Sequence, residues 1–144
     1  MNENKLKHLE LIQNVINRMA ANSFLLKGWT VTLVSSIFVL SQKDSNSAYV
    51  IVALLPIIGF WILDSYFIKQ ERLFRKLYDQ VRVTDINEID FSMNTSNFNL
   101  SIKYCSFSKT FITFYGSILI AVIVILLIGN FEKLRLFWVC ISPS

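Results

Sequence analysis

Two charged residues lie inside stretches of this sequence that are otherwise apolar enough to enter a lipid bilayer. Lys27 lies near the start of the apolar block 24–41, and Asp64 lies near the end of the block 48–68. If these blocks form a helical hairpin that turns at residues 45 and 46, the position at the same depth as residue 27 is residue 64. An unpaired charge at the bilayer centre costs about 2.5 to 3.5 kcal/mol on insertion scales. The spacing therefore predicts an intramembrane ion pair between Lys27 and Asp64.

A second interpretation of these two residues stays open. Each lies within about one helical turn of the membrane surface, where its side chain can reach water separately. If they do pair, a structural clamp is favoured over a proton or ion relay. A relay needs further ionisable groups along its path, and the apolar blocks contain no others.

Other residue types that perform chemistry are sparse. His8 is the single histidine, which excludes a metal site made of several histidines, and we expect it on the polar side of the first helix. Cys105 and Cys140 are far apart in sequence and indicate neither a disulfide framework nor a metal site. The four glycines are too dispersed for a phosphate-binding loop. We expect no catalytic residue, no cofactor and no enzymatic activity.

The composition indicates a membrane protein. Hydrophobic residues make up 53% of the 144 residues and charged residues 17%, and the apolar residues collect in the blocks 24–41, 48–68 and 110–129. Each block is about long enough to cross a hydrocarbon core of ~30 Å as a helix. The net charge of +4 comes from residues that flank these blocks, so we expect lipid contacts and no nucleic-acid binding. The predicted fold is an all-α membrane protein with three transmembrane helices.

The segments between the blocks add four expectations. Residues 4–23 have helical periodicity, with Leu9, Ile12 and Ile16 on one face, and predict an amphipathic helix. Pro56 predicts a kink in the second span, whose pattern continues as a long cytoplasmic extension that ends near residues 83–87. Residues 88–106 alternate in polarity, which leaves a small β-hairpin and an ordered loop both open. Residues 130–144 are predicted to form an interfacial tail.

The distribution of basic residues predicts the orientation. Lysines and arginines lie before the first span and throughout residues 69–109, whereas only Lys43 lies between the first two spans. Because cytoplasmic loops of membrane proteins are enriched in these residues, the amino terminus and the region 69–109 are expected in the cytoplasm.

Small residues recur at every fourth position in two of the predicted spans. These two small-residue stripes are Gly28, Thr32 and Ser36 in the first span and Thr113, Ser117 and Ala121 in the third. Such stripes let helix backbones approach closely in lipid, so we expect the two to pack together, within one chain or between copies. Three spans enclose little interior, and any permeation path would have to form between copies. A homo-oligomer is therefore expected.

The sequence also resembles a known group of proteins. The string HLELIQNVINRMAANSFLLKGWTVTLVSS, followed by LDSYFIKQERLFRKLYDQVR, resembles small bacterial multi-span membrane proteins of mostly unknown function, some encoded beside anti-phage defence systems. The similarity covers residues 5–82, and NSFLLKGW and QERLFRKLYD are its most specific parts. The resemblance implies a membrane effector in the bacterial inner membrane that disturbs the envelope when infection is sensed. It contains no motif with an assigned chemical role, so no functional residue follows from it.

Three functional hypotheses remain open at this stage. The first is an oligomeric inner-membrane effector, or a subunit of one, that is triggered at its cytoplasmic face and disturbs membrane integrity. The second is a non-conducting anchor that recruits a cytoplasmic protein partner through residues 69–109. The third is a phage-type holin, which the long cytoplasmic helices disfavour.

Overall fold

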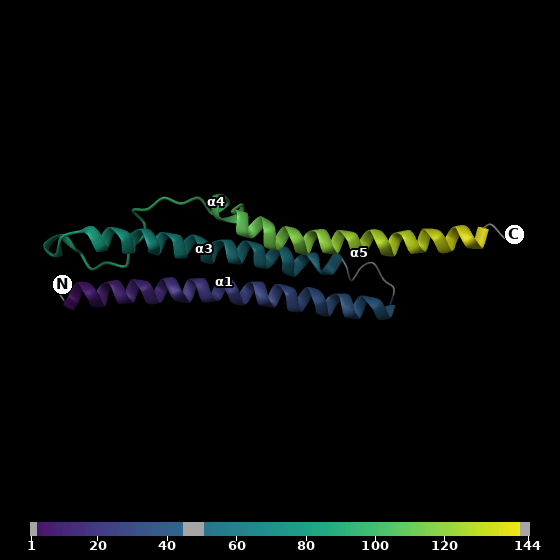
Figure 1. The fold of residues 1–144 in the computed structure, drawn as a ribbon, viewed down its shortest axis with the longest axis horizontal. Coiled ribbons are helices and arrows are strands. Elements are labelled where there is room, and N and C mark those ends of the chain that lie inside the picture. The colour runs from purple at the N-terminus through teal and green to yellow at the C-terminus, as the bar shows by residue number, and fades with distance from the viewer. Residues whose placement is uncertain (1–2, 45–50, 142–144) are drawn as a thin grey trace. The chain divides into compact units, whose positions relative to one another are not determined.

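The chain is built of helices. The computed structural model describes the backbone of residues 3–44 and 51–141 and the side chains of residues 3–41 and 51–128. Its elements in chain order are α1 (Glu3–Asp44), α3 (Leu54–Val83), the short 3-10 helix η1 (Ile86–Glu88), α4 (Ile102–Ser106) and α5 (Lys109–Ile141) (Figure 1). No strand occurs within those two ranges, so the predicted all-helical class is confirmed.

The predicted amphipathic helix 4–23 and the first apolar block 24–41 form one uninterrupted helix. Residues 3–44 contain no proline, and Gly28 is their single glycine, so nothing in the sequence ends the helix at the expected boundary. The helix has 42 residues, about twice the ~20 residues that cross a hydrocarbon core. A helix of this length extends well beyond a bilayer that it crosses.

The chain divides into two compact units. Unit 1 comprises residues 1–28 and 62–108, and unit 2 comprises residues 29–61 and 109–144. Within unit 1, α1 and α3 run antiparallel and side by side (Figure 1). The core between them consists of Leu9, Ile12, Ile16, Leu77 and Val81. Burying each such aliphatic side chain stabilises the fold by about 1.5 to 3 kcal/mol. The predicted apolar face of residues 4–23 is therefore the face that packs on α3.

The segment after α3 is a loop. Helix α3 ends at Val83, inside the range predicted for it, and Asp85 then caps η1 by accepting a hydrogen bond from the backbone N–H of Asn87 at 3.1 Å. Ile89 and Phe98 fold the loop onto the unit 1 core. Of the two alternatives for residues 88–106, the structure has the loop. The alternating pattern near its end is not a strand, because Ile102 and Tyr104 belong to α4.

Unit 2 has a small aromatic and aliphatic centre. The rings of Trp61 and Tyr115 stack at 5.8 Å with an interplanar angle of 7°, and Tyr115 also contacts Phe111 and Phe114. Around this centre most large apolar side chains are exposed. They include Val39, Leu40, Leu55, Ile58, Ile112, Ile120, Ile123, Leu127 and Ile128. An apolar surface of this kind is unfavourable in water and is suited to lipid.

Pro56 acts at the start of α3 and does not bend a longer helix at its middle. Residues 51 and 52 are helical, Ala53 forms a turn, and α3 begins at Leu54. A proline ring clashes with the carbonyl four residues earlier, here that of Val52, and Pro56 is then tolerated in the first turn of the new helix. The predicted kink is therefore a break between helical segments.

Two helices are long and apolar enough to cross a membrane. They are α1 as far as Ser41 and α5 over Lys109–Ile128, and only 17% of the most apolar window of each is buried in the chain. A core helix of a water-soluble protein would be mostly buried. Helix α3, which contains most of the second predicted span, is not among these two helices, and positions 48–50 of that span lie outside the described residues. Helix α5 continues beyond the third block to Ile141, so residues 130–141 extend that helix.

Candidate functional site

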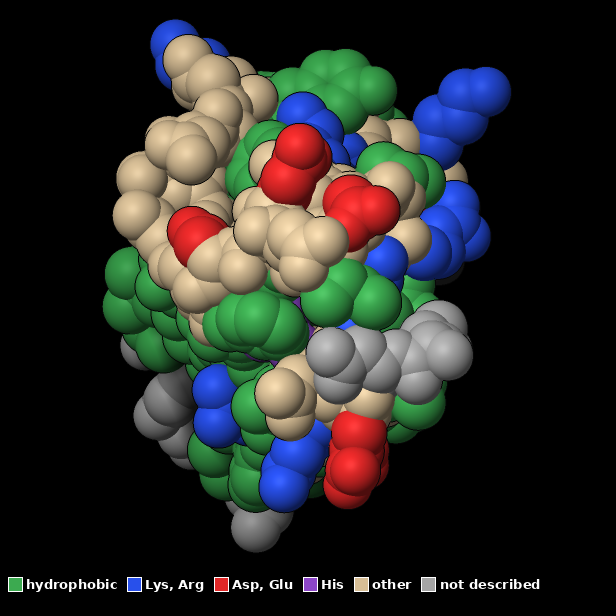
Figure 2. All heavy atoms as spheres, turned by 90° about the vertical axis from the view of Figure 1, so that its left-hand side faces the viewer, with side chains coloured by type: hydrophobic (Ala, Val, Ile, Leu, Met, Phe, Trp, Pro, Cys, Tyr) green, Lys and Arg blue, Asp and Glu red, His purple; other side chains and the backbone are tan. Residues whose placement is uncertain are grey.

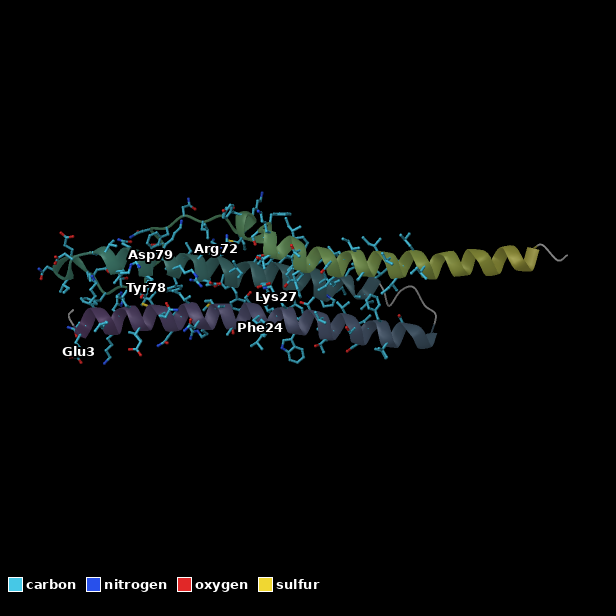
Figure 3. All side chains as sticks on the ribbon, in the orientation of Figure 1. Glu3, Phe24, Lys27, Arg72, Tyr78 and Asp79 are labelled. Atoms are coloured by element: carbon cyan, nitrogen blue, oxygen red, sulfur yellow. The ribbon has the colours of Figure 1, made fainter. Side chains whose placement is uncertain are left out.

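The two charged residues that the hairpin argument placed at equal depth are in contact. Lys27 on α1 donates a hydrogen bond from Nζ to Oδ2 of Asp64 on α3, at 2.6 Å. The Asp64 side chain is 0% exposed and that of Lys27 is 18% exposed. Figure 3 shows Lys27 lying between the two helices. Unit 1 thus contains a buried ion pair.

Ser23 completes the coordination of the ammonium group. Lys27 Nζ donates to Ser23 Oγ at 2.8 Å and to the Ser23 carbonyl oxygen at 3.5 Å, from one helical turn away. A lysine ammonium has three N–H donors, so these two oxygens and the Asp64 carboxylate provide an acceptor for each. A charge removed from water remains tolerable only when it is paired and hydrogen-bonded in this way.

The pair marks a change in character along the helix interface. Buried apolar positions on α1 recur after three and four residues, at Leu9, Ile12 and Ile16, and Ser23 is buried two helical turns later. On α3 the buried residues change from Leu73 and Leu77 to Asp64 and Ser65. The interface is therefore apolar from Leu9 to Ile16 and polar around Lys27. Removing one partner of such a pair costs about 3 to 5 kcal/mol, because the other charge stays buried.

A second lysine fixes the far end of the same interface. Lys5 Nζ donates to the carbonyl oxygens of Arg82 and Thr84, at 3.1 and 2.8 Å. These carbonyls lie at the carboxyl end of α3, where helix geometry leaves acceptors without an intrahelical partner and where a cation is favoured. Lys5 therefore caps α3 from α1, a role that no residue pattern had indicated.

His8 does not lie on the polar side of α1, and that prediction was wrong. Its side chain is buried, and its ring meets that of Phe91 edge to face at 5.5 Å. Phe91 has a φ of 52°, a left-handed conformation that is uncommon outside glycine. Among the described residues, no group forms a hydrogen bond with His8 Nε2. The signal was present in the spacing, since positions 8, 12 and 16 lie on one helical face.

A shallow polar pocket lies where the loop folds back on the end of α3. Its volume is about 190 Å³, and it is lined by Leu77, Gln80, Val81, Thr84, Glu88, Ile89, Asp90, Ser92, Asn94, Asn97 and Phe98. Figure 2 shows acidic, other polar and hydrophobic side chains next to one another on this end of unit 1. Within the described residues, no group of three or more His, Cys, Asp or Glu side chains is arranged to hold a metal ion.

The two small-residue stripes lie on the surface of the single chain. All six residues, Gly28, Thr32, Ser36, Thr113, Ser117 and Ala121, are exposed. The hydroxyls of Ser36, Thr113 and Ser117 bond to carbonyls of their own helices. A Cβ added at Gly28 would meet nothing within 4 Å, so the described residues leave space at this position. Packing of the two stripes together, within one chain or between copies, stays a prediction.

Cys105 is buried and Arg72 lies beside it. The Nη1 atom of Arg72 is 3.9 Å from Cys105 Sγ, and its guanidinium carbon lies 5.6 Å from the centre of the Tyr104 ring. Arg72 points away from α1, on the opposite side of α3 from Lys27 (Figure 3). Cys105 has no disulfide in the structure, whereas the side chain of Cys140 lies outside the described residues.

Comparisons with protein-family models, with curated proteins and with solved structures find no match to this chain.

Proposed function

We propose that this chain is an integral protein of the bacterial inner membrane that acts, as an oligomer, by disturbing membrane integrity when it is triggered at its cytoplasmic face. The single observation that carries the proposal is the exposed apolar surface of α1 and α5, of which so little is buried within the chain. Lipid is the solvent that such a surface requires. The role in anti-phage defence rests on the resemblance of residues 5–82 alone.

In this proposal three helical segments cross the membrane, with the amino terminus and unit 1 at the cytoplasmic side. The concentration of lysine and arginine in residues 69–109 supports this orientation. The Lys27–Asp64 pair then lies near the cytoplasmic surface, where the first and second spans leave the lipid. Its role is that of a clamp that holds α1 against α3, because the described apolar segments provide no further ionisable group for a relay.

The small-residue stripes are the proposed contacts between copies. They are exposed in the single chain, and the hydroxyls of Ser36, Thr113 and Ser117 bond to carbonyls of their own helices, so another helix can approach without leaving these hydroxyls unpaired. A permeation path formed between copies would follow from this assembly.

The alternative is a non-conducting anchor that recruits a cytoplasmic protein through residues 69–109. The pocket of about 190 Å³ beside the loop is the observation that favours it, because it offers carboxylate, amide and hydroxyl groups to a partner. Membrane potential distinguishes the two proposals. Induced expression, followed with a voltage-sensitive dye, should depolarise cells if the chain is an effector and leave the potential unchanged if it is an anchor.

A matched variant makes that experiment specific. Ser117→Leu blocks close helix approach at one stripe, while Leu127→Ile keeps the apolar character of an exposed position on the same helix. The effector proposal expects depolarisation to be lost in the first variant and retained in the second. Equal depolarisation by both variants would contradict assembly through the stripe.

A further inference from the structure

Two aromatic side chains are exposed where unit 1 leads into α5. Tyr104 on α4 is 70% exposed, and Phe107, which follows that helix, is 64% exposed. They are three positions apart, whereas Cys105 between them is fully buried. Both rings therefore offer most of their area to the surroundings of the chain.

The chain around these rings is positively charged. Lys103 and Lys109 flank them, and no Asp or Glu occurs between Phe91 and Phe131. From α3, the Arg72 guanidinium lies over the Tyr104 ring. The acidic neighbour of Arg72 in the chain, Glu71, forms its own salt bridge with Arg75 at 2.7 Å. This surface therefore combines exposed aromatic rings with cations and offers little negative charge.

The connection to α5 limits where this surface can lie. Only Phe107 and Ser108 separate α4 from α5, which begins at Lys109 and is apolar from Phe111 onward. Five residues join Tyr104 to Lys109, and an extended chain of that length covers at most about 18 Å. If α5 crosses a membrane, α4 lies close to the headgroups of the leaflet where the crossing starts. Aromatic residues are enriched at that level, and basic residues are attracted to anionic leaflets.

We infer that α4 and Phe107 form an interfacial anchor that binds anionic phospholipid. The rings of Tyr104 and Phe107 insert at headgroup level, and Lys103 and Arg72 contact the phosphate groups. Arg72 is also a positioning residue, since its guanidinium holds the Tyr104 ring. The inference rests on the proposed function in one respect, which is that α5 spans the bilayer.

An environment-sensitive fluorophore tests the anchor. The full chain with Cys105→Ala and Cys140→Ala carries a single cysteine, labelled with NBD, from Tyr104→Cys, Ile120→Cys or Asn97→Cys. Each protein is reconstituted in vesicles of phosphatidylcholine alone or mixed with phosphatidylglycerol, and iodide quenching from water is measured. The label at position 120, which is exposed on α5, shows whether that helix is shielded by lipid. The label at position 97, which is exposed in the loop, is the reference for a site in water.

The anchor predicts that the label at 104 is shielded from iodide relative to the label at 97, and only when phosphatidylglycerol is present. Lys103→Glu should lower the lipid-bound population by at least about fivefold. The matched control Lys7→Glu makes the same charge change at an exposed site on α1 and should leave shielding intact.

Each of the other outcomes contradicts one part of the inference, which is the anchor, its anionic ligand or the membrane span. If 120 is shielded and 104 is as accessible as 97, the anchor is wrong and the membrane span stands. If 104 is shielded equally without phosphatidylglycerol and with Lys103→Glu, the rings are covered by apolar lipid or by protein, and the anionic ligand is wrong. If 120 is as accessible as 97, the span itself fails, and the anchor fails with it.

Discussion

Lys27 and Asp64 are 37 positions apart in the chain and 2.6 Å apart in space. The contact joins the two helices of unit 1 at the point where their interface becomes polar, and three acceptors surround the ammonium group. This geometry is suited to holding α1 against α3, because the Asp64 carboxylate is buried and has no contact with water.

Breaking the pair from one side should be more damaging than removing it entirely. Lys27→Leu or Asp64→Leu each leaves a buried charge, so each single variant should lower the free energy of unfolding by about 3 to 5 kcal/mol. The double variant should be less destabilised than either, because no charge remains buried. Thermal unfolding in detergent, with the monodisperse fraction as a second readout for variants that fold poorly, measures this.

The control for these single and double variants is Lys7→Leu. It removes an exposed lysine from the same helix and should change the free energy of unfolding little. A double variant whose loss equals the sum of the two single losses would show that Lys27 and Asp64 act independently.

The Lys5 cap should stabilise the carboxyl end of α3. Lys5→Met keeps the aliphatic stem and removes both hydrogen bonds, so the helix should fray at its last turn and lose about 1 to 2 kcal/mol of stability. Hydrogen exchange at Thr84, whose N–H donates to the Gln80 carbonyl at 3.1 Å, reports the fraying. Unchanged exchange relative to Lys7→Met would mean that the cap contributes nothing.

The loop should be held on unit 1 by its apolar contacts. Phe98→Ala removes a half-buried ring that packs against the unit 1 core and should cost about 1 to 2 kcal/mol, enough to raise the rate of limited proteolysis within residues 85–101. Asn99→Ala, at the exposed neighbouring position, should not alter the cleavage rate. Equal cleavage of both variants would show that the loop is not fixed by Phe98.

Assembly should depend on the exposed small residues. Ser36→Leu and Ser117→Leu each place a large side chain on a stripe, and each should shift the detergent-solubilised protein to a smaller assembly in mass measurements. Val39→Leu changes an exposed apolar position of α1 and should leave the mass unchanged. A monomeric parent protein would contradict the oligomer directly.

The features that followed from the sequence are those with a simple geometric origin. The Lys27–Asp64 contact was predicted by placing the first two apolar blocks antiparallel, with a turn at residues 45 and 46. The apolar face of Leu9, Ile12 and Ile16 was predicted from helical periodicity. Both depend on helix geometry and on the antiparallel hairpin. Neither needs knowledge of distant packing.

The features that did not follow depend on contacts between distant segments. His8 was assigned to the polar side by its residue type, although its spacing matches Ile12, and burial against Phe91 decides its place. The alternation that suggested a strand runs into α4, where Cys105 packs inward beside Arg72. The role of Lys5 depends on where α3 ends, 77 positions later for the bond to Arg82.

We propose that lipid surrounds the apolar helices and that unit 1 lies in the cytoplasm. Labelling of single cysteines at positions 46 and 97 with a membrane-impermeant maleimide, in the Cys105→Ala, Cys140→Ala background, determines on which side of the membrane each position lies. We expect labelling at 46 in intact cells and at 97 only after the inner membrane is permeabilised. Labelling at 97 in intact cells, or recovery of the protein in the soluble fraction, would contradict it.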